Sequence, residues 1–481
     1  MEFTYAERPV YPGVGMDDLY GQIEADPRGL ERSGASFASG GSALAYLGPL
    51  GGLIALCGVI LGITWPMGML WVGLLIAGVL MMLTTLIRIN LGLMLLAAAI
   101  PWEAITRLSD SFTLVKAMGI LVAFLGLLHV FFRGAQKWPT TFKILAVFCV
   151  WASVGMAAKP SVLGLLGYMA LLSNVILVYL CFRFCSEPTA LRSLVIVIFI
   201  SSVGQALLGV LMGIEAGARG RLTTSKDINV NTYVRLMFFG VFLGPIVFAC
   251  LKSAFARILV AFGLIVSLGA ALLTGSRGAV LGIFAGLVLM VLTIRSARFR
   301  FGAKLAILVG AAVLVIVAWM FASRSGGGQL WAERLSAQSL SEGVQSRIGR
   351  WKASIEMGLE NPVLGVGFGN EALTYYFKGI IATESHNDMI SVLAMTGIPG
   401  LLLYLFFLGA WLLDVWRMPY GIWRSSLLGM WLAFFTTSMF NPSLTKKSLW
   451  LGVAICATCI VRAKQFLGTR CELPHADVPA R

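Results

Sequence analysis

His386 stands at the boundary between a long polar segment and an apolar run, where a proton-transfer group could act. It is followed by Asn387 and Asp388, and Glu384 precedes it by two positions. A neutral imidazole accepts a proton near neutral pH, and neighbouring carboxylates can orient the ring or raise its basicity. A structural histidine at a membrane interface is the alternative, but nearby arginines favour chemistry. We therefore expect His386 to act as a general base.

Cationic side chains gather in segments that we expect on the same membrane surface as His386. They are Arg219, Arg221, Lys226 and Arg235 in or beside one loop, Arg277 between two apolar runs, and Arg347 and Arg350 in the long polar segment. The planar guanidinium group binds phosphate through paired hydrogen bonds and stays charged where water is scarce. The cluster therefore predicts a ligand that carries phosphate.

Arg277 lies in a minimal turn, Thr274 to Gly278, that interrupts apolar sequence on both sides. Ionisable residues at membrane depth are costly, usually face a cavity and often serve function. An interfacial arginine can instead extend its charged end toward lipid headgroups. From the sequence, both roles stay open.

The long polar segment contains an amphipathic pattern. Its apolar residues recur three or four positions apart and are Leu340, Val344, Ile348, Trp351, Ile355 and Leu359. This spacing predicts a helix that ends at Asn361-Pro362, with its apolar stripe on the bilayer or on other helices. Arg347, Arg350 and Ser354 would share the adjacent polar face, where a merely solvated charged surface is the alternative. Which of the two arginines faces a site stays open.

Composition determines the class of protein. Hydrophobic residues make up 58% of the 481 residues, charged residues 12%, and the mean hydropathy is +0.87. A water-soluble domain could not bury so much apolar surface in one core. We expect an all-α polytopic membrane protein with about 12–14 transmembrane helices and a large, partly helical loop at 322–387, since a spanning helix needs about 20 apolar residues. The candidate runs are 43–62, 67–87, 89–101 (short, and possible as a tilted or re-entrant segment), 114–132, 141–157, 162–182, 192–213, 231–250, 256–273, 278–294, 304–321, 388–412, 425–440 and 448–463.

Basic residues in alternate loops predict the orientation. With both termini in the cytoplasm, inward loops carry most of the Lys and Arg that flank the runs, as the positive-inside rule requires. The 322–387 loop then faces outward, toward the periplasm. Residues 1–42 hold seven acidic and three basic residues, and we expect a disordered cytoplasmic tail. The main domain is expected at 43–465, followed by a cytoplasmic tail at 466–481.

Several other classes are disfavoured. The formal charge of +15 fits topology and contact with anionic membrane lipids better than nucleic-acid binding. The eight cysteines avoid the long loop, and Cys456 and Cys459 fit a helix core better than a zinc site. The glycines of Gly365 to Gly369 fit a loop turn better than a nucleotide site. We expect no cofactor and no metal, although carboxylates that bind a divalent ion together with substrate phosphates stay possible.

The ordered motifs resemble the O-antigen ligase and Wzy-type polymerase superfamily over roughly residues 219–412. The similar segments are Thr274-Gly275-Ser276-Arg277-Gly278-Ala279, Arg347 with Arg350-Trp351, Asn361 through Asn370, His386-Asn387, and Thr396-Gly397-Ile398-Pro399-Gly400. The combination in this order is specific, although each piece alone is not. The acidic amino-terminal tail has no role that the resemblance explains.

The resemblance implies a GT-C-like glycosyltransferase of the bacterial inner membrane that uses a glycan carried on undecaprenyl pyrophosphate. By analogy, Arg277 and Arg347 hold the pyrophosphate and His386 acts on the acceptor hydroxyl. Arg350 replaces or assists Arg347, and Arg221 and Asn387 contact substrate. A ligase transfers the glycan to a lipid A-core sugar or another terminal acceptor, whereas a polymerase transfers it to another lipid-linked unit. We favour the ligase slightly.

A transporter of lipid-linked sugars is a different class with similar needs. It too would require many helices and outward-facing arginines. A transport path, however, predicts polar groups through several helices, whereas this chain concentrates them at one face. A structural membrane protein would leave the ordered Arg277, Arg347 and His386 without a role. The distribution of charge therefore favours an enzyme.

Overall fold

The fold is helical wherever the structure describes it. The computed structural model describes residues 70–103, 113–133, 138–215, 230–294, 337–377, 385–419 and 421–471, together with residues 48, 51–53, 56, 106 and 136. Of the described residues 85% are helical and none is in a strand. The predicted all-α membrane fold is therefore confirmed. The run at 304–321, the predicted amino-terminal tail at 1–42 and most of the run at 43–62 lie outside the described residues, as do residues 472–481 of the predicted carboxyl-terminal tail at 466–481.

The helices follow the apolar runs of the sequence closely. Before the long polar segment they are α4 (Leu70–Ile87), α5 (Ile89–Ala99), the short 3-10 helix η1 (Ile100–Trp102), α6 (Leu114–Arg133), α7 (Thr140–Ala158), α8 (Val162–Phe184), α9 (Pro188–Glu215), α10 (Val230–Cys250), α11 (Ala254–Leu273) and α12 (Arg277–Thr293). In and after that segment they are α15 (Ala337–Glu360), α16 (Glu371–Phe377), α17 (Asp388–Trp416), α18 (Ile422–Ser438) and α19 (Lys447–Cys471). The last helix continues past the expected domain end at residue 465.

Seven of the described helices are long and apolar enough to cross a membrane, namely α6 to α11 and α17. Large apolar side chains cover their outer faces, for example Phe124, Val150 and Phe262, which are 65%, 64% and 55% exposed. Lipid tails, unlike water, accept such surfaces without cost. The chain is thus a multi-pass membrane protein, and the expected total of 12–14 spans stays a prediction.

Helix α10 forms the centre of the bundle. It packs against α9, α11 and α18, and its large side chains Tyr233, Phe238 and Phe242 are fully buried. Because lipid offers no hydrophobic drive for helix association, close packing has to hold such helices together. Because α10 is enclosed by other helices, the side chains that it contributes to a site are held in place by packing.

Small residues bring α12 and α18 into close contact. Gly278, Gly282 and Gly286 recur every four residues on one face of α12. A Cβ atom at Gly282 would lie 2.9 Å from the carbonyl oxygen of Ala433, and one at Gly286 only 2.4 Å from that of Gly429. This is the small-residue packing typical of membrane helices. It holds the first turn of α12 beside the end of α18.

Helix α17 bends at Gly397, and the polar segment before it docks on the bend. Gly397 has a φ of 70° and interrupts the helical backbone. The amide of Ile398 donates to the carbonyl of Pro362 at 2.8 Å, and that of Val366 donates to Ala394 at 2.8 Å. Irregular backbone in a membrane protein requires such partners. The glycine-rich segment is therefore a turn, as predicted, whose glycines admit neighbouring protein backbone.

A lysine and an asparagine fasten this turn to the α7–α8 connection. Lys159 donates through Nζ to Asn361 Oδ1 at 2.5 Å and to the carbonyl of Gly365 at 2.9 Å. Asn370 donates to the carbonyl of Lys159 at 2.9 Å and accepts a hydrogen bond from Ser161. The docked turn thus ties the polar segment to the helix bundle.

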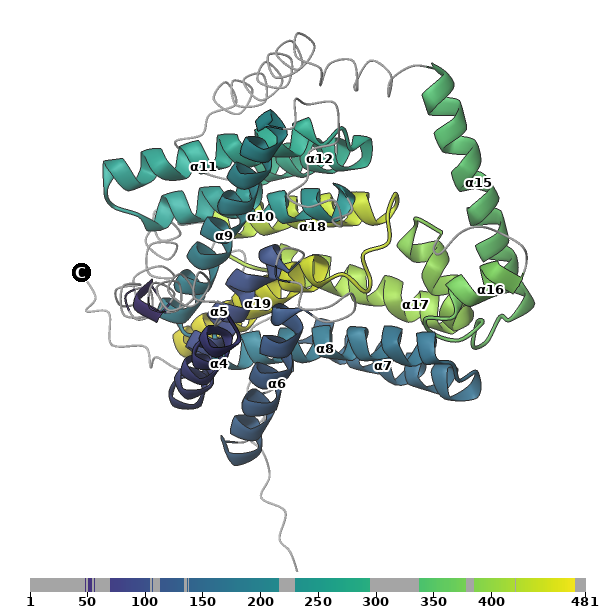
Figure 1. The fold of residues 1–481 in the computed structure, drawn as a ribbon, viewed down its shortest axis with the longest axis horizontal. Coiled ribbons are helices and arrows are strands. Elements are labelled where there is room, and N and C mark those ends of the chain that lie inside the picture. Colours follow the sequence, from purple (N-terminus) through teal and green to yellow (C-terminus); the bar gives the residue numbers. More distant parts are fainter. Residues whose placement is uncertain are drawn as a thin grey trace, which may run out of the picture.

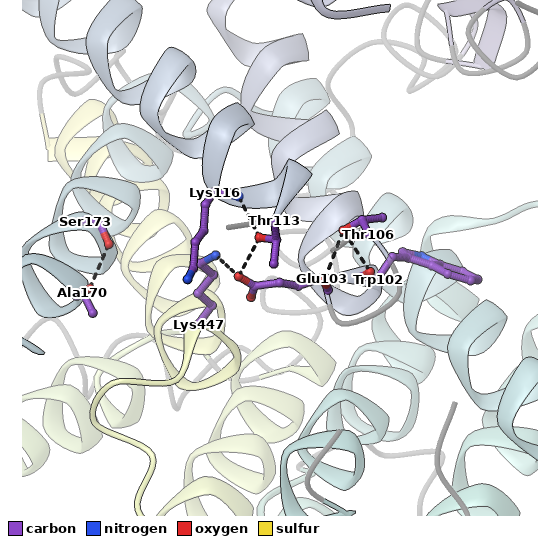
Figure 2. Close-up of polar contacts among 8 residues, drawn as sticks. All are labelled: Trp102, Glu103, Thr106, Thr113, Lys116, Ala170, Ser173 and Lys447. Atoms are coloured by element: carbon purple, nitrogen blue, oxygen red, sulfur yellow. Dashed lines mark hydrogen bonds and ion pairs between the residues drawn. The ribbon is translucent and has the colours of Figure 1, made fainter. Parts of the chain in front are cut away.

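An ion pair joins the early helices to the last one. The Glu103 carboxylate pairs with Lys447 at the start of α19, and Thr113 donates to that carboxylate at 3.2 Å (Figure 2). Figure 1 shows α15 running across one end of the bundle, at right, while α7, α8, α17 and α18 lie along it.

Replacement of Gly397 by alanine should destabilise the fold. The left-handed backbone disfavours any Cβ, and this one would meet the carbonyl oxygen of Val363 at 2.4 Å, so we expect a cost of about 1–3 kcal/mol. Thermal unfolding in lipid nanodiscs measures it. Gly409→Ala on the same helix is the control, because nothing lies within 4 Å of its Cβ position. Equal melting temperatures for the two variants would contradict the docked bend.

Candidate functional site

The predicted helix of the long polar segment is confirmed as α15, which ends at Glu360, directly before Asn361-Pro362. It packs on α17 through a buried face of Ala353, Ser354 and Met357 rather than through the predicted apolar stripe. In that stripe Ile348 and Leu359 are 52% and 62% exposed. The stripe is therefore left for the bilayer, one of the two positions expected for it.

Arg277 begins α12 immediately after a tight turn. Gly275 in this turn has a φ of 67°, a conformation that favours glycine. The Ser276 hydroxyl donates to Asn231 Oδ1 at 2.7 Å and makes no cap for the helix. Half-buried Arg277 and the first-turn amides of α12 therefore create positive potential at one place.

Arg347 lies against the turn that follows α18. Its guanidinium carbon is 5.9 Å from the ring centre of Phe440, and Gly278 packs against the same phenylalanine. Burial, followed by the charges of Arg277 and Arg350, lowers the pKa of Arg347 below its usual value. The three arginines are thus close enough to repel one another.

The arginine cluster has no counter-charge in the described part of the chain. There, no carboxylate lies within ion-pairing distance of Arg277, Arg347 or Arg350. Clustered guanidinium groups with low solvent access attract an anion with several oxygens, and phosphate groups match their fork geometry. Chemically, this surface can bind a phosphate or a pyrophosphate.

His386 is half-buried and held in an unusual backbone conformation. Its φ is 61°, which makes it the one residue other than glycine with positive φ in the described ranges. Its Nδ1 atom lies 3.4 Å from Oδ1 of Asn441. With this oxygen as acceptor, Nδ1 carries the proton and Nε2 presents its lone pair. The arrangement can therefore orient an imidazole for proton abstraction.

Asn387 and Asp388 hold the start of α17. The Asn387 side-chain oxygen accepts from the amides of Met389 at 2.9 Å and Ile390 at 3.3 Å, as a helix cap does. Asp388 accepts from the amides of Ser443 at 2.7 Å and Leu444 at 3.2 Å. Its carboxylate thus fixes the turn after α18, whereas the sequence suggested that a neighbouring carboxylate orients the ring of His386.

The same turn is held from its other side by Arg235. This fully buried arginine of α10 donates to the carbonyl of Pro442 at 3.0 Å and to that of Asn441 at 2.5 Å. Two residues of this turn contact the site, since Phe440 lies against Arg347 and Asn441 lies against His386. It therefore links the cationic part of the site to the histidine.

The structure brings most of the predicted site residues to one surface. Arg277 and Arg350 lie near Arg347, Arg347 and His386 contact the turn after α18, and Asn387 caps α17 beside the histidine. Arg221 lies outside the described residues. No set of three or more His, Cys, Asp and Glu side chains in the described ranges is arranged as metal ligands.

The sequence analysis missed Phe440 and Asn441. An Asn-Pro pair directly after an apolar run was the available signal for them. Arg235 was counted among the outward cations, but its part in holding the turn was not foreseen.

Comparison with known proteins agrees with the motifs. Residues 262–405 match the family model described as O-antigen ligase. The teichuronic acid biosynthesis protein TuaE of Bacillus subtilis (strain 168) is 25% identical over 293 residues, which cover 54% of this chain and 58% of TuaE. The chain thus spans somewhat more than half the length of this relative. The resemblance to the ligase and polymerase superfamily is confirmed.

The matched region contains only part of the site. Arg277, Arg347 and His386 fall inside residues 262–405, whereas Arg235 and Asn441 lie outside them. Helices from both sides of the matched region therefore complete the surface.

Arg347→Gln should separate anion binding from stability. Removing one of three repelling charges should leave the melting temperature of the empty protein equal or slightly higher, because no counter-charge is lost. Affinity for inorganic pyrophosphate should fall at least about tenfold, since a hydrogen bond to a charged group contributes about 1.5–3 kcal/mol. Isothermal titration calorimetry and thermal unfolding measure the two effects.

The matched control for this prediction is Arg257→Gln. Arg257 lies in the first turn of α11, whereas Arg277 follows the last turn of that helix. Arg257 is bound to the carbonyl of Leu251, and its loss should not change pyrophosphate affinity. If Arg347→Gln bound pyrophosphate as tightly as the wild type, the cluster would not be the anion site.

Proposed function

We propose that this chain, whose residues 262–405 match the family model described as O-antigen ligase, moves a glycan from undecaprenyl pyrophosphate to an acceptor hydroxyl. The observation that carries the proposal is the arrangement of Arg277, Arg347 and Arg350, without a described counter-charge, around the turn that also contacts His386. A cation cluster suits the pyrophosphate of the donor, and an oriented imidazole suits activation of the acceptor. Both are required on one surface for a single displacement.

The proposed reaction forms one bond and breaks one bond at the anomeric carbon. The acceptor oxygen attacks this carbon while its proton passes to Nε2 of His386. The bond to the pyrophosphate oxygen breaks, and the electron pair leaves with the lipid pyrophosphate. Arg277 and Arg347 stabilise the charge that develops on this leaving group. A single displacement inverts the anomeric configuration, and because the donor linkage supplies the free energy, we expect neither nucleotide nor metal to be required.

The contacts support separate roles for the remaining residues. Arg347, rather than Arg350, is assigned to the pyrophosphate because its guanidinium lies against the Phe440 turn. Arg350 assists through its charge, and Arg221 stays a proposed substrate contact outside the described residues. Asn387 acts by capping α17 next to the histidine. We assign the site to the periplasmic face of a bacterial inner membrane, with both termini cytoplasmic.

A polymerase is the second candidate. The relative TuaE is named for teichuronic acid biosynthesis, and a polymerase of this chemistry would use a second lipid-linked glycan as its acceptor. Both activities use the same donor chemistry at the same site and differ in the acceptor. The acceptor is therefore a lipid A-core sugar for a ligase and a second undecaprenyl-linked unit for a polymerase.

His386→Ala and Arg277→Ala should each abolish most of the transfer. Loss of a general base typically lowers the rate about 10²- to 10⁴-fold, and loss of a charge-stabilising donor about 10²- to 10³-fold. Purified protein in lipid is given undecaprenyl-pyrophosphate glycan and either acceptor, and release of lipid pyrophosphate is measured. The size of the product separates ligation from polymerisation.

His129→Ala and Arg257→Ala are the controls for this assay, because both residues lie away from the site. They should retain wild-type rates. A wild-type protein that moved the donor across the bilayer and transferred it to no acceptor would be a transporter, and the enzyme proposal would fail.

Asn441→Asp should move the pH dependence of transfer. A carboxylate facing Nδ1 favours the charged imidazolium, so the acidic limb of the rate profile should shift to higher pH by about one unit or more. Asn441→Ala should lower the rate about tenfold without that shift, because the ring loses its orientation only. Rates between pH 5 and 9 measure both, and an unshifted profile for Asn441→Asp would show that residue 441 does not face the catalytic ring.

A further inference from the structure

A buried carboxylate lies between the arginine helix and the histidine. Glu371, in the first turn of α16, is 5% exposed, and the proposed mechanism gives it no task. It contacts hydroxyl groups from α15, α16 and α17. A buried carboxylate is costly unless it is hydrogen-bonded, so its position demands an explanation.

One carboxylate oxygen of Glu371 is bound to the helix that carries the arginines. Ser354 donates to Oε1 at 2.7 Å, and Ser354 lies four residues after Arg350 and seven after Arg347 on α15. Tyr375 contacts Ser354 and donates to the carbonyl of Arg350 at 3.0 Å. This oxygen therefore holds the part of α15 from which both arginines extend.

Tyr375 is suited to its part in this contact. Burial, followed by the neighbouring Glu371 charge, raises the pKa of the Tyr375 phenol above its usual value. The phenol therefore stays protonated and can donate to the Arg350 carbonyl throughout the pH range of a cell. Glu371 thus fixes both hydroxyl groups of the α15 contact.

The other carboxylate oxygen reaches the residues on both sides of His386 through two serine hydroxyl groups. Ser391 donates to Oε2 at 2.7 Å and lies 2.7 Å from the Ser385 hydroxyl. The Ser385 hydroxyl lies 2.9 Å from the Asn387 carbonyl oxygen and accepts from the Asn387 amide at 3.2 Å. Ser385 and Asn387, the two neighbours of His386 in the sequence, both take part in these hydrogen bonds. The hydrogen bonds can therefore maintain the positive φ of His386.

We propose that Glu371 is a positioning residue that sets the distance between the arginines of α15 and the imidazole of His386. Its two oxygens are bound to two segments that are not adjacent in the sequence, α15 and residues 385–391, so one side chain connects them. This inference rests on the proposed function, in which pyrophosphate and acceptor must meet at one carbon. Misplacement of reacting groups by about 1 Å can cost about 10²-fold in rate.

Two serine variants cut the two contacts separately. Ser391→Ala releases the histidine segment and should lower kcat at least about tenfold, with the KM for the donor within about twofold of wild type. Ser354→Ala releases α15 and should raise the donor KM about tenfold, with a smaller effect on kcat. Glu371→Gln, which keeps the shape of the side chain, should change both. Glu356→Gln is the matched control, because it removes an exposed carboxylate of α15 and should behave as wild type.

A merely structural role predicts a different result. It would lower the amount of folded protein in all three variants and leave kcat and KM of the folded fraction unchanged, or change them alike in both serine variants. Either result overturns the proposal. If Glu371→Gln does not fold, the contrast between Ser391→Ala and Ser354→Ala decides.

Two readouts without transfer separate this inference from the proposed function. Affinity for inorganic pyrophosphate should fall about tenfold in Ser354→Ala and stay unchanged in Ser391→Ala. The rate at which diethyl pyrocarbonate modifies His386, measured by peptide mass against His129 as internal reference, should change in Ser391→Ala alone. If wild-type protein shows no transfer but these two differences appear, the proposed function fails and the positioning role stands. If neither difference appears, the positioning role fails.

Discussion

The site depends on the turn after α18, which two buried side chains, Arg235 and Asp388, hold in place. Both side chains are fully enclosed, and both are hydrogen-bonded to the backbone of this turn. A buried polar group that loses its hydrogen-bond partner costs about 1–3 kcal/mol, so replacing either side chain should loosen the turn. Through this turn, Phe440 reaches Arg347 and Asn441 reaches His386. The positions of Arg347 and His386 therefore depend on the two buried side chains that hold this turn.

The arginine cluster imposes an opposite condition on the empty protein. Burial, and then the charges of Arg277 and Arg350, lower the pKa of Arg347, so both neighbours repel Arg347, and no described carboxylate neutralises the cluster. Such an arrangement persists only if the surrounding structure fixes it. The close α12–α18 packing and the Glu371 contacts provide this support from two sides. A dianionic pyrophosphate would relieve the repulsion. The arginine cluster therefore lowers the stability of the empty protein but favours binding of the donor and stabilises its leaving group.

Much of the fold could be predicted from the sequence because a bilayer imposes a length on apolar runs. The runs at 231–250 and 256–273 became α10 and α11 with boundaries within two residues, and the amphipathic spacing of 340–359 became α15. Other features were not predictable in this way. Gly278, Gly282 and Gly286 form a packing stripe whose partner on α18 lies about 150 residues further along the chain, and no local pattern names that partner.

The sequence by itself determined the class of the protein, the positions of its helices and the residue types of its chemistry. Arg277 and His386 stand out because ionisable groups beside apolar runs are costly and often mark function, Arg347 stands out on the polar face of a predicted amphipathic helix, and the ordered motifs point to the O-antigen ligase family. Only the tertiary structure decided which groups hold them. Asn441 faces His386 across 55 residues of chain, and Glu371 reaches two separate segments. Such contacts depend on how helices pack, and packing brings together residues that periodicity and spacing cannot relate.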